Sequence, residues 1–269
     1  MEHHLDFYSL VGFSHETAAP ENLDGLSIST DETALFLDFD GTLVDIADTP
    51  DAIAVSRSDR LLLDRLNTHF NNAVSVISGR NLRAIKQYLP SFSGTISGGH
   101  GAEICHNSGN VAEIECNFDR LEHIKKAAIE FAIIDPRVLA EEKQHGIVLH
   151  FRQHPELEGK VHDFLKSLID GDDDFELQEA KMAVEVKPKG ISKASAIENI
   201  MASDAFDGRT ILFAGDDVTD EIAFNFVKER GGITIKVGEG LTAAQYRTAS
   251  PATFKNWLLA QIAPHHREC

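Results

Sequence analysis

The sequence predicts an α/β protein with a doubly wound parallel sheet as its core and an inserted α+β cap domain. Two observations predict the core. Short apolar runs without alternation are separated by stretches of helical spacing, as in a parallel sheet that helices cover on both faces. An acidic cluster also follows one such run in each half of the chain. The third observation predicts the cap: between these parts strands come in pairs, which is typical of an antiparallel sheet.

Composition narrows the class of partner. A chain of 269 residues, 42% hydrophobic and 25% charged, can bury a large core. Its formal charge of −18 argues against nonspecific binding to nucleic acid or to an anionic membrane, and an anionic small-molecule substrate would need a metal ion and a few local cations. Cys105, Cys116 and Cys269 are widely spaced and predict neither a disulfide framework nor a zinc site. With no basic start and no apolar stretch long enough for a bilayer, we expect a cytoplasmic protein, monomeric or weakly oligomeric.

The first core strand leads into two aspartates. Ala34–Leu37 is apolar throughout, as expected of a buried parallel strand, and Asp38 and Asp40 follow before Gly41 and Thr42 turn the chain. Residues two apart share a face, so both carboxylates project to one side at the carboxyl end of the sheet, where such sheets bind ligands. Two like charges so close are costly unless a cation or a shared proton relieves them. The pair therefore indicates Mg²⁺ and phosphate chemistry, although an isolated pair is more often a solvated acidic turn.

The rest of the first part alternates helix and strand. Leucines at helical spacing predict a helix over 58–70, and an apolar run predicts a strand over 72–77. A short helix over 82–89 is stopped by Pro90, and a third strand begins at 94–97. This order is the βαβαβ opening of a doubly wound sheet.

The pattern changes between residues 110 and 186. Helices are predicted over 121–134 and 157–168, and strand pairs within 138–152 and 175–186. Along the last strand, apolar and polar positions alternate: Met182, Val184 and Val186 against Ala183, Glu185 and Lys187. Such a block is an inserted α+β domain, and a continuous doubly wound domain with long crossovers is the less favoured alternative.

The parallel pattern resumes after this block. The predicted elements are a helix over 192–201 with Ser192 as its cap, a strand over 210–214, a helix over 219–228, a strand over 233–237 and a helix over 251–262. Residues 1–30 are polar and aperiodic, which predicts an extension outside the core. The predicted domains are thus the N-terminal extension (1–30), two core parts (31–109 and 187–269) and the cap (110–186).

Four clusters stand at strand ends or helix starts of the core, where one site could collect them. They are Asp38–Thr42, Ser78 at the end of the second strand, Lys193 at a helix start, and Gly215–Glu221 after a second buried strand. Free backbone N–H groups after Ser78 favour a phosphate, and a lysine at a helix start opposes the helix dipole unless an anion lies close by. Each cluster is weak evidence alone, but their order and spacing together are strong evidence.

The four clusters resemble the motifs of the haloacid dehalogenase-like phosphohydrolases. More narrowly, residues 32–262 are similar to the trehalose-6-phosphate phosphatase family. The segments that carry this narrower resemblance are His100–Glu103, Glu142-Lys143, Leu149–Arg152, Lys181–Pro188 and Gly215–Glu221. Ala194 departs from the pattern, since relatives usually have glycine there, and residues 1–30 match nothing in it.

The resemblance implies a mechanism and a set of residue roles. Asp38 would be the nucleophile that forms an aspartyl-phosphate, and Asp40 the general acid and then the base that activates water. The remaining roles follow from the same motifs. Mg²⁺ would be held by the Asp38 carboxylate, the Asp40 main-chain carbonyl and Asp216, while Asp217 and Asp220 would orient these ligands or bind the ion directly. The phosphate would bind Thr42, Ser78 and Lys193. The sugar would contact His100, Glu103, Glu142, Lys143, His150, Arg152, Lys181 and Glu185.

Three other functions are compatible with parts of the pattern. The same chemistry could act on another sugar phosphate, such as sucrose phosphate or a glycosyl-glycerate phosphate, or in a phosphomannomutase-like transferase. A receiver-like phospho-acceptor or binding module also combines strand-end acids with a lysine. The second aspartate of the first motif and the inserted cap count against that module, because it needs neither a leaving-group acid nor a lid.

Overall fold

A nine-stranded sheet forms the centre of the larger of two units in the computed structural model, which describes residues 19–46, 53–180 and 182–263. The larger unit contains the described residues up to Ala112 and from Ser192 onward. Its strands are β1 (Glu21–Asn22), β2 (Thr33–Asp38), β3 (Val74–Ile77), β4 (Thr95–Gly98), β5 (Glu103–Cys105), β6 (Val111–Glu113), β11 (Thr210–Gly215), β12 (Ile233–Val237) and β13 (Tyr246–Thr248).

The strand order places the two acidic motifs side by side. The order is β1-β13-β12-β11-β2-β3-β4-β5-β6. The neighbouring strands from β1 to β4 in this order pair in parallel, whereas β5 runs antiparallel to β4. β2 is therefore central and pairs with β11, in a register that matches Ala214 with Leu37. Because all six residues of β2 are buried, the strand needs apolar side chains on both faces.

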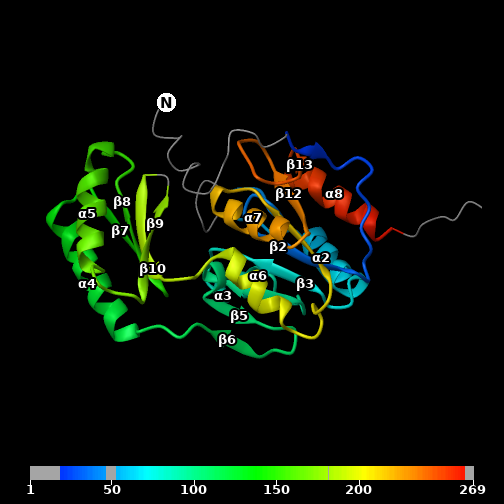
Figure 1. The fold of residues 1–269 in the computed structure, drawn as a ribbon, viewed down its shortest axis with the longest axis horizontal. Coiled ribbons are helices and arrows are strands. Elements are labelled where there is room, and N and C mark those ends of the chain that lie inside the picture. The colour runs from blue at the N-terminus through cyan, green and yellow to red at the C-terminus, as the bar shows by residue number, and fades with distance from the viewer. Residues whose placement is uncertain (1–18, 47–52, 181, 264–269) are drawn as a thin grey trace, which may run out of the picture. The chain divides into compact units, whose positions relative to one another are not determined.

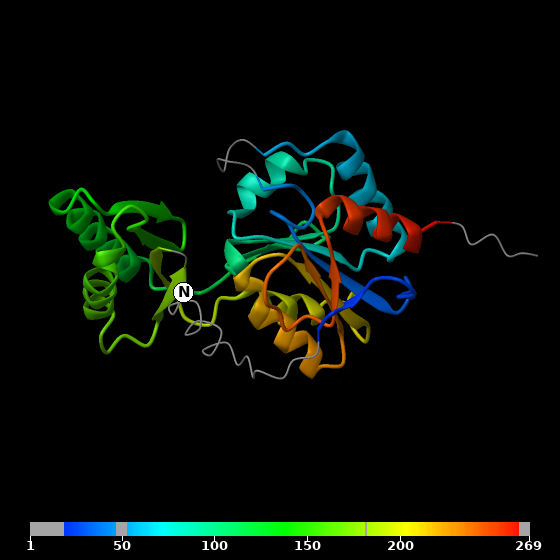
Figure 2. The same ribbon diagram turned by 90° about the horizontal axis from the view of Figure 1, so that it is seen from above.

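Helices cover both faces of this sheet, as Figure 2 shows. One core lies under α2 (Arg57–His69), α3 (Leu82–Tyr88) and α8 (Pro251–Gln261), and the other under α6 (Lys193–Met201) and α7 (Glu221–Glu229). Short 3₁₀ turns, η2 (Gly99–Gly101) and η4 (Val218–Asp220), follow β4 and β11. This arrangement confirms the doubly wound core. None of the helices within the described ranges is long and apolar enough to cross a membrane.

The segment before the first core strand differs from its prediction. Within the predicted extension, β1 adds a parallel strand beside β13, and Leu23, Leu26 and Ile28 pack against the core. The Nε1 of Trp257 donates to the Leu26 carbonyl at 3.2 Å. The expectation that these residues lie outside the core is therefore wrong for the part that is described, because scattered apolar residues without periodicity still cover a sheet edge. Residues 1–18 lie outside the described ranges.

The smaller unit, Glu113–Ile191, is a four-stranded antiparallel sheet with two helices on one face (Figure 1). Its strands are β7 (Leu139–Lys143), β8 (Gly146–His150), β9 (Phe175–Ala180) and β10 (Ala183–Pro188), and their order in the sheet is β7-β8-β10-β9. Its helices are α4 (Phe118–Ile134) and α5 (Glu158–Leu168), with the 3₁₀ turn η3 (Pro155–Leu157) before α5. Leu121, Val161, Leu149 and Val184 meet in its core. The unit is the predicted α+β insertion, and β10 continues two residues past the predicted boundary at 186.

Candidate active site

Asp38 and Asp216 lie together at the carboxyl end of the sheet. One carboxylate oxygen each from Asp38, Asp216 and Asp220 lies within 4.8 Å of the others. Gly41 permits this approach: its φ is +81°, and a Cβ at Gly41 would lie 2.0 Å from Oδ2 of Asp216. The loop after β2 thus packs directly on the second acidic motif, and the two motifs share one site.

Lys193 joins two of these carboxylates. Its Nζ donates to Oδ1 of Asp38 at 2.6 Å and to Oδ1 of Asp220 at 2.5 Å, and all three side chains are buried. Helix α6 begins at Lys193 because Ser192 and Ser195 form a capping box. Burial opposes the charged form of Lys193, but the carboxylates of Asp220 and Asp38 raise its pKa. The carboxylates of Asp38 and Asp220 are therefore the nearby anions that a lysine at the start of a helix needs.

Asp220 organises the loop that carries Asp216. Its Oδ2 accepts from the main-chain N–H groups of Asp216 and Asp217, each at 2.9 Å, while its Oδ1 binds Lys193. Asp217 is exposed and stands at the N-terminal end of η4. Because both Asp220 oxygens already have partners, its arrangement suits orientation of Asp216 more than direct metal binding.

The electrostatics of the site favour a divalent cation. Burial, together with the carboxylates of Asp38 and Asp220, raises the pKa of Asp216 to about 8. Burial also raises the pKa of Asp38 to about 6, against the lowering effect of Lys193. Oδ2 of Asp38 is buried without a hydrogen-bond partner in the described part of the chain. Three carboxylates against one lysine leave excess negative charge, and oxygen ligands of this kind suit Mg²⁺. The residues therefore fit a metal ion.

Asp40 faces a residue that the sequence did not single out. Nε and Nη2 of Arg80 donate to its two carboxylate oxygens at 2.7 and 2.9 Å, forming a bidentate ion pair. The guanidinium also lies 5.5 Å from the ring centre of Tyr88. The signal that could have identified Arg80 is its position two residues after Ser78, at the carboxyl end of β3, where the adjacent strand presents Asp38 and Asp40.

Thr42 and Ser78 lie on two different loops at the carboxyl end of the sheet. The Thr42 hydroxyl is buried with no hydrogen-bond partner among the described residues, so it has capacity for a ligand oxygen. The Ser78 Oγ, also buried, accepts from the Arg80 N–H at 3.1 Å. Both positions are compatible with the predicted phosphate contacts.

His100 and Glu103 support the loop after β3. The His100 backbone has φ +57°, its N–H donates to the Ser78 carbonyl at 2.9 Å, and a Cβ on Gly79 would lie 2.5 Å from its Nε2. Glu103 accepts from the Leu82 N–H at 3.1 Å, the start of α3. The structure thus gives Glu103 a helix-capping contact, and the sugar contacts predicted for these two residues stay predictions.

Within the smaller unit, Lys143 and Glu185 form an ion pair. The Lys143 Nζ donates to Oε2 of Glu185 at 2.8 Å, and Glu185 is buried. His150 is the register partner of Ala183, two residues from Glu185, so it shares the sheet face of Glu185, and its Nε2 lies 2.7 Å from Oε2 of Glu141. These three predicted sugar-binding side chains lie on the face that the helices leave uncovered.

Three other predicted sugar-binding residues are not in this group. Glu142 is the register partner of Ile147, whose side chain packs in the core beneath the helices, and Glu142 lies 3.7 Å from Lys125 of α4. It therefore points to the opposite face from Lys143. Arg152 is exposed, two residues past the end of β8. Lys181 lies outside the described residues.

The chain matches one family model over most of its length. The model, described as trehalose-phosphatase, covers residues 36–252. A probable trehalose-phosphate phosphatase of Sinorhizobium fredii is 32% identical over 244 residues, which are 90% of this chain and 92% of that protein. The trehalose-6-phosphate phosphatase of Escherichia coli is 32% identical over 226 residues, 84% of this chain and 85% of that protein.

Solved structures share the fold over most of the chain. The crystal structure of a trehalose-6-phosphate phosphatase related protein has a TM-score of 0.67 at 26% identity, covering 85% of this chain and 96% of its own. The C-terminal domain of the Candida albicans trehalose-6-phosphate phosphatase has a TM-score of 0.72 at 18% identity, covering 92% and 99%. The latter likeness supports the fold alone.

Proposed function

The chain belongs to the trehalose-phosphatase family, and on that premise we propose that it hydrolyses trehalose 6-phosphate to trehalose and inorganic phosphate. The reaction class is phosphoric monoester hydrolysis. The observation that carries the proposal is the convergence of Asp38, Asp216 and Asp220 at the carboxyl end of the sheet, where Lys193 binds the first and the last of them. A receiver-like module is no longer an alternative, because the match runs through both acidic motifs and the insertion between them.

The first half of the reaction uses Asp38 as nucleophile. One of its carboxylate oxygens forms a bond to phosphorus, and the bond from phosphorus to the sugar oxygen breaks with its electron pair going to that oxygen. Asp40 donates the proton that turns this oxygen into a hydroxyl. In the structure Arg80 holds both oxygens of Asp40, so the acid role requires one oxygen to turn to the leaving group while the other stays on Arg80, which keeps the carboxyl oriented.

The second half regenerates the enzyme. Asp40 accepts a proton from a water molecule, the water oxygen bonds to phosphorus, and the bond from phosphorus to Asp38 breaks. Thr42, Ser78 and Lys193 bind phosphoryl oxygens in both halves. Since the chain carries a net charge of −18, the local cation Lys193 is needed to accept an anionic substrate.

Mg²⁺ is the proposed metal ion. The Asp38 carboxylate, the Asp40 main-chain carbonyl and Asp216 would hold it, and the unpartnered Oδ2 of Asp38 supports that assignment. When bound, the ion supplies positive charge that screens the phosphate from the attacking carboxylate. The sugar contacts proposed from the smaller unit are Lys143, His150 and Glu185, together with Arg152 and Lys181.

The experiment is a substrate panel with inorganic phosphate as the readout. The purified protein is incubated with Mg²⁺ and, in parallel, with excess chelator, on trehalose 6-phosphate, sucrose 6-phosphate, a glycosyl-glycerate phosphate and mannose 6-phosphate. We expect trehalose 6-phosphate to give the highest kcat/KM and the chelator to abolish release. A higher kcat/KM on another sugar phosphate would reassign the substrate, and isomerised substrate without released phosphate would indicate a mutase. The monomeric or weakly oligomeric state and the cytoplasmic location stay predictions.

A further inference from the structure

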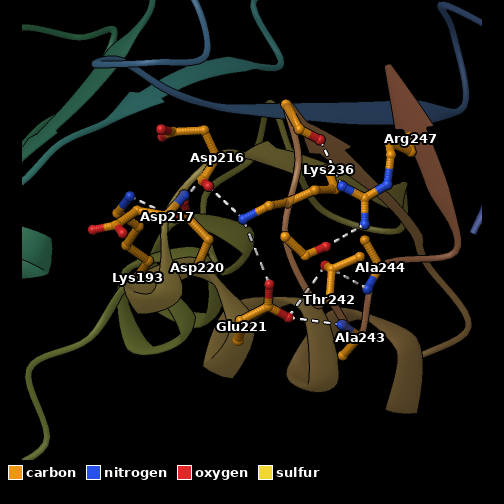
Figure 3. A network of polar contacts seen from close by, with 12 residues as sticks. Lys193, Asp216, Asp217, Asp220, Glu221, Lys236, Thr242, Ala243, Ala244 and Arg247 are labelled. Atoms are coloured by element: carbon orange, nitrogen blue, oxygen red, sulfur yellow. Dashed lines mark hydrogen bonds and ion pairs between the residues drawn. The ribbon is translucent and has the colours of Figure 1, made fainter. Parts of the chain in front are cut away.

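A buried lysine contacts the metal-site loop from the neighbouring strand. Lys236 lies on β12 as the register partner of Gly215, the residue that precedes Asp216. Its Nζ donates to the main-chain carbonyl of Asp216 and lies 3.7 Å from Oε1 of Glu221 (Figure 3). The side chains of Lys236 and Glu221 are 4% and 1% exposed, so both charges are removed from water.

The main chain of Asp216 is held on both of its polar groups. Its N–H donates to Oδ2 of Asp220 at 2.9 Å, and its carbonyl accepts from Lys236. Asp216 lies just beyond the end of β11, where strand pairing no longer supplies backbone partners. Side chains therefore replace the sheet in fixing this peptide, and the peptide fixes where the Asp216 carboxylate can point.

Glu221 in turn connects Lys236 to the loop before β13. Its Oε2 accepts from the Ala243 N–H at 2.7 Å and from the Thr242 hydroxyl at 3.3 Å. Its Oε1 has no hydrogen-bond partner within the described chain and faces Lys236 (Figure 3). The lysine thus has one neutral acceptor at Asp216 and one counter-charge at Glu221.

A buried ion pair of this kind is costly as a purely structural device. Removing an ammonium or a carboxylate from water is unfavourable, and apolar residues of similar volume often stabilise a fold as well or better. A function for the pair is therefore worth testing, and the contact with Asp216 indicates which function.

We propose that Lys236 and Glu221 are positioning residues for the metal-binding loop. Lys236 fixes the Asp216 peptide so that the Asp216 carboxylate stays beside that of Asp38, and Glu221 keeps Lys236 in place. The inference rests on the proposed function in one respect, namely that Asp216 binds the metal ion. It is independent of which sugar phosphate the enzyme accepts.

The test measures Mg²⁺ binding to the metal-free full-length protein by titration calorimetry, without substrate. Lys236→Met removes the ammonium group and keeps a side chain of similar length. We expect it to weaken Mg²⁺ affinity by about 10-fold or more, the usual effect of losing a group that orients a metal ligand. Lys236→Arg retains a cation at this position and should recover part of the affinity.

A second lysine provides a matched control. Lys228 donates to the Ala243 carbonyl at 2.9 Å, so it anchors the loop before β13, which Glu221 also holds, without touching Asp216. We expect Lys228→Met to leave Mg²⁺ affinity within about twofold of wild type, below the effect of an orienting group. Equal losses in the Lys228→Met and Lys236→Met variants would show that general loosening of the loop is responsible and would overturn the proposal.

Two further variants keep the result interpretable. We expect the Asp216→Asn variant to lose Mg²⁺ binding. If this variant binds Mg²⁺ as tightly as wild type, or if wild type binds no Mg²⁺, both the metal assignment and this proposal are wrong. If Lys236→Met does not fold, Glu221→Gln is titrated instead, with weakened affinity expected and unchanged affinity contradicting the role of the pair. A wild-type protein that binds Mg²⁺ but releases no phosphate from trehalose 6-phosphate would overturn the proposed function and leave this inference standing.

Discussion

Single residues decide the charge balance of the site. Lys193 contacts Asp38 and Asp220 directly, so two buried carboxylates share one cation, whereas no ion pair among the described residues includes Asp216. The arrangement leaves Asp38 with one oxygen on the lysine and the other, Oδ2, unpartnered. The lysine thus fixes the direction of the Asp38 carboxylate, and such positioning favours its attack on phosphorus.

Asp38→Asn is the direct test of the nucleophile. The amide has nearly the shape of the carboxylate but cannot form the acyl-phosphate, so we expect phosphate release from trehalose 6-phosphate to fall by at least ~10³-fold. Because the substitution also removes a raised-pKa carboxyl from a buried site, the unfolding temperature should not fall substantially. Release at the wild-type rate would contradict the assignment of Asp38.

Arg80→Ala tests the contact with Asp40. Without the guanidinium the Asp40 carboxyl is no longer oriented, and general acid catalysis is typically worth ~10²–10⁴-fold. We expect the rate of phosphate release from trehalose 6-phosphate to fall by about 10²-fold or more. The first turnover of p-nitrophenyl phosphate should fall much less, because its leaving group needs no proton.

The comparison is made by rapid-mixing measurement of the p-nitrophenol burst alongside steady-state phosphate release. Arg80→Lys serves as the conservative variant, since it keeps the charge but not the bidentate geometry. Equal losses on both substrates would mean that Arg80 supports phosphate binding or the fold instead of orienting the acid.

At the scale of elements, the sequence predicted a helix cap and a strand but not the turn before that strand. The start of α6 was predictable at Ser192, where the capping box with Ser195 is local in sequence. The alternation along β10 is also present, with Val184 and Val186 in the core and Glu185 on the other face. Met182 does not continue that pattern, because it has φ +58° in the turn before the strand.

The uncovered face of the four-stranded sheet gives a prediction at this scale. If Lys143 and Glu185 bind sugar, Lys143→Ala and Glu185→Ala should lower kcat/KM for trehalose 6-phosphate by ~10-fold or more while changing p-nitrophenyl phosphate turnover little. Glu142→Ala is the matched control, since Glu142 belongs to the same strand as Lys143 but lies on the helix-covered face. Steady-state kinetics on both substrates decide the matter, and parallel losses on the two would indicate a structural ion pair.

For the whole molecule, the sequence predicted the central part of the fold and the residues that meet there. Continuous apolar runs identify the strands β2 and β11. The acidic residues that follow them can form one site only if the two strands are neighbours, and in the sheet they are paired. Partners that depend on distant packing could not be predicted. To predict the contacts of Arg80 with Asp40 and of Lys236 with Asp216, one would need the strand order. To predict the pairing of β1, one would need to know which edge of the sheet is free.

The sequence also could not predict on which face of the sheet each side chain of the insertion lies. Glu142 and Lys143 are adjacent in sequence and equally polar, and only the register with β8 shows that they point to opposite faces. A one-residue shift of register would exchange them.

The pH dependence of stability is a property of the whole protein. The pKa of Asp216 is raised to about 8 and that of Asp38 to about 6, from an ordinary value of 3.8. Such groups bind more protons in the folded state, so their contribution to the free energy of unfolding is full below pH 3.8 and is lost as the pH rises through the folded pKa. We expect the metal-free protein to lose stability from about pH 5.5 to pH 8, and added Mg²⁺ to stabilise it most at the upper end.

Thermal unfolding in chelator and in Mg²⁺ across this range tests the expectation. Asp59 and Asp172, whose pKa values are lowered by their ion pairs with Lys255 and Arg120, contribute only at lower pH and do not obscure the trend. Asp216→Asn should flatten the pH dependence and reduce the Mg²⁺ effect. A metal-free unfolding temperature that rises towards pH 8 would contradict the expectation.

The central position of β2 has a consequence for biosynthesis. The strand pairs with β3 on one side and with β11 on the other, and β11 follows the entire insertion in the chain. While the nascent chain leaves the ribosome, one side of this mostly apolar strand has no partner until Thr210–Gly215 has been translated. Unpaired strand edges recruit other chains. The protein is therefore most exposed to misassembly, and most dependent on chaperones, during the time needed to translate its insertion.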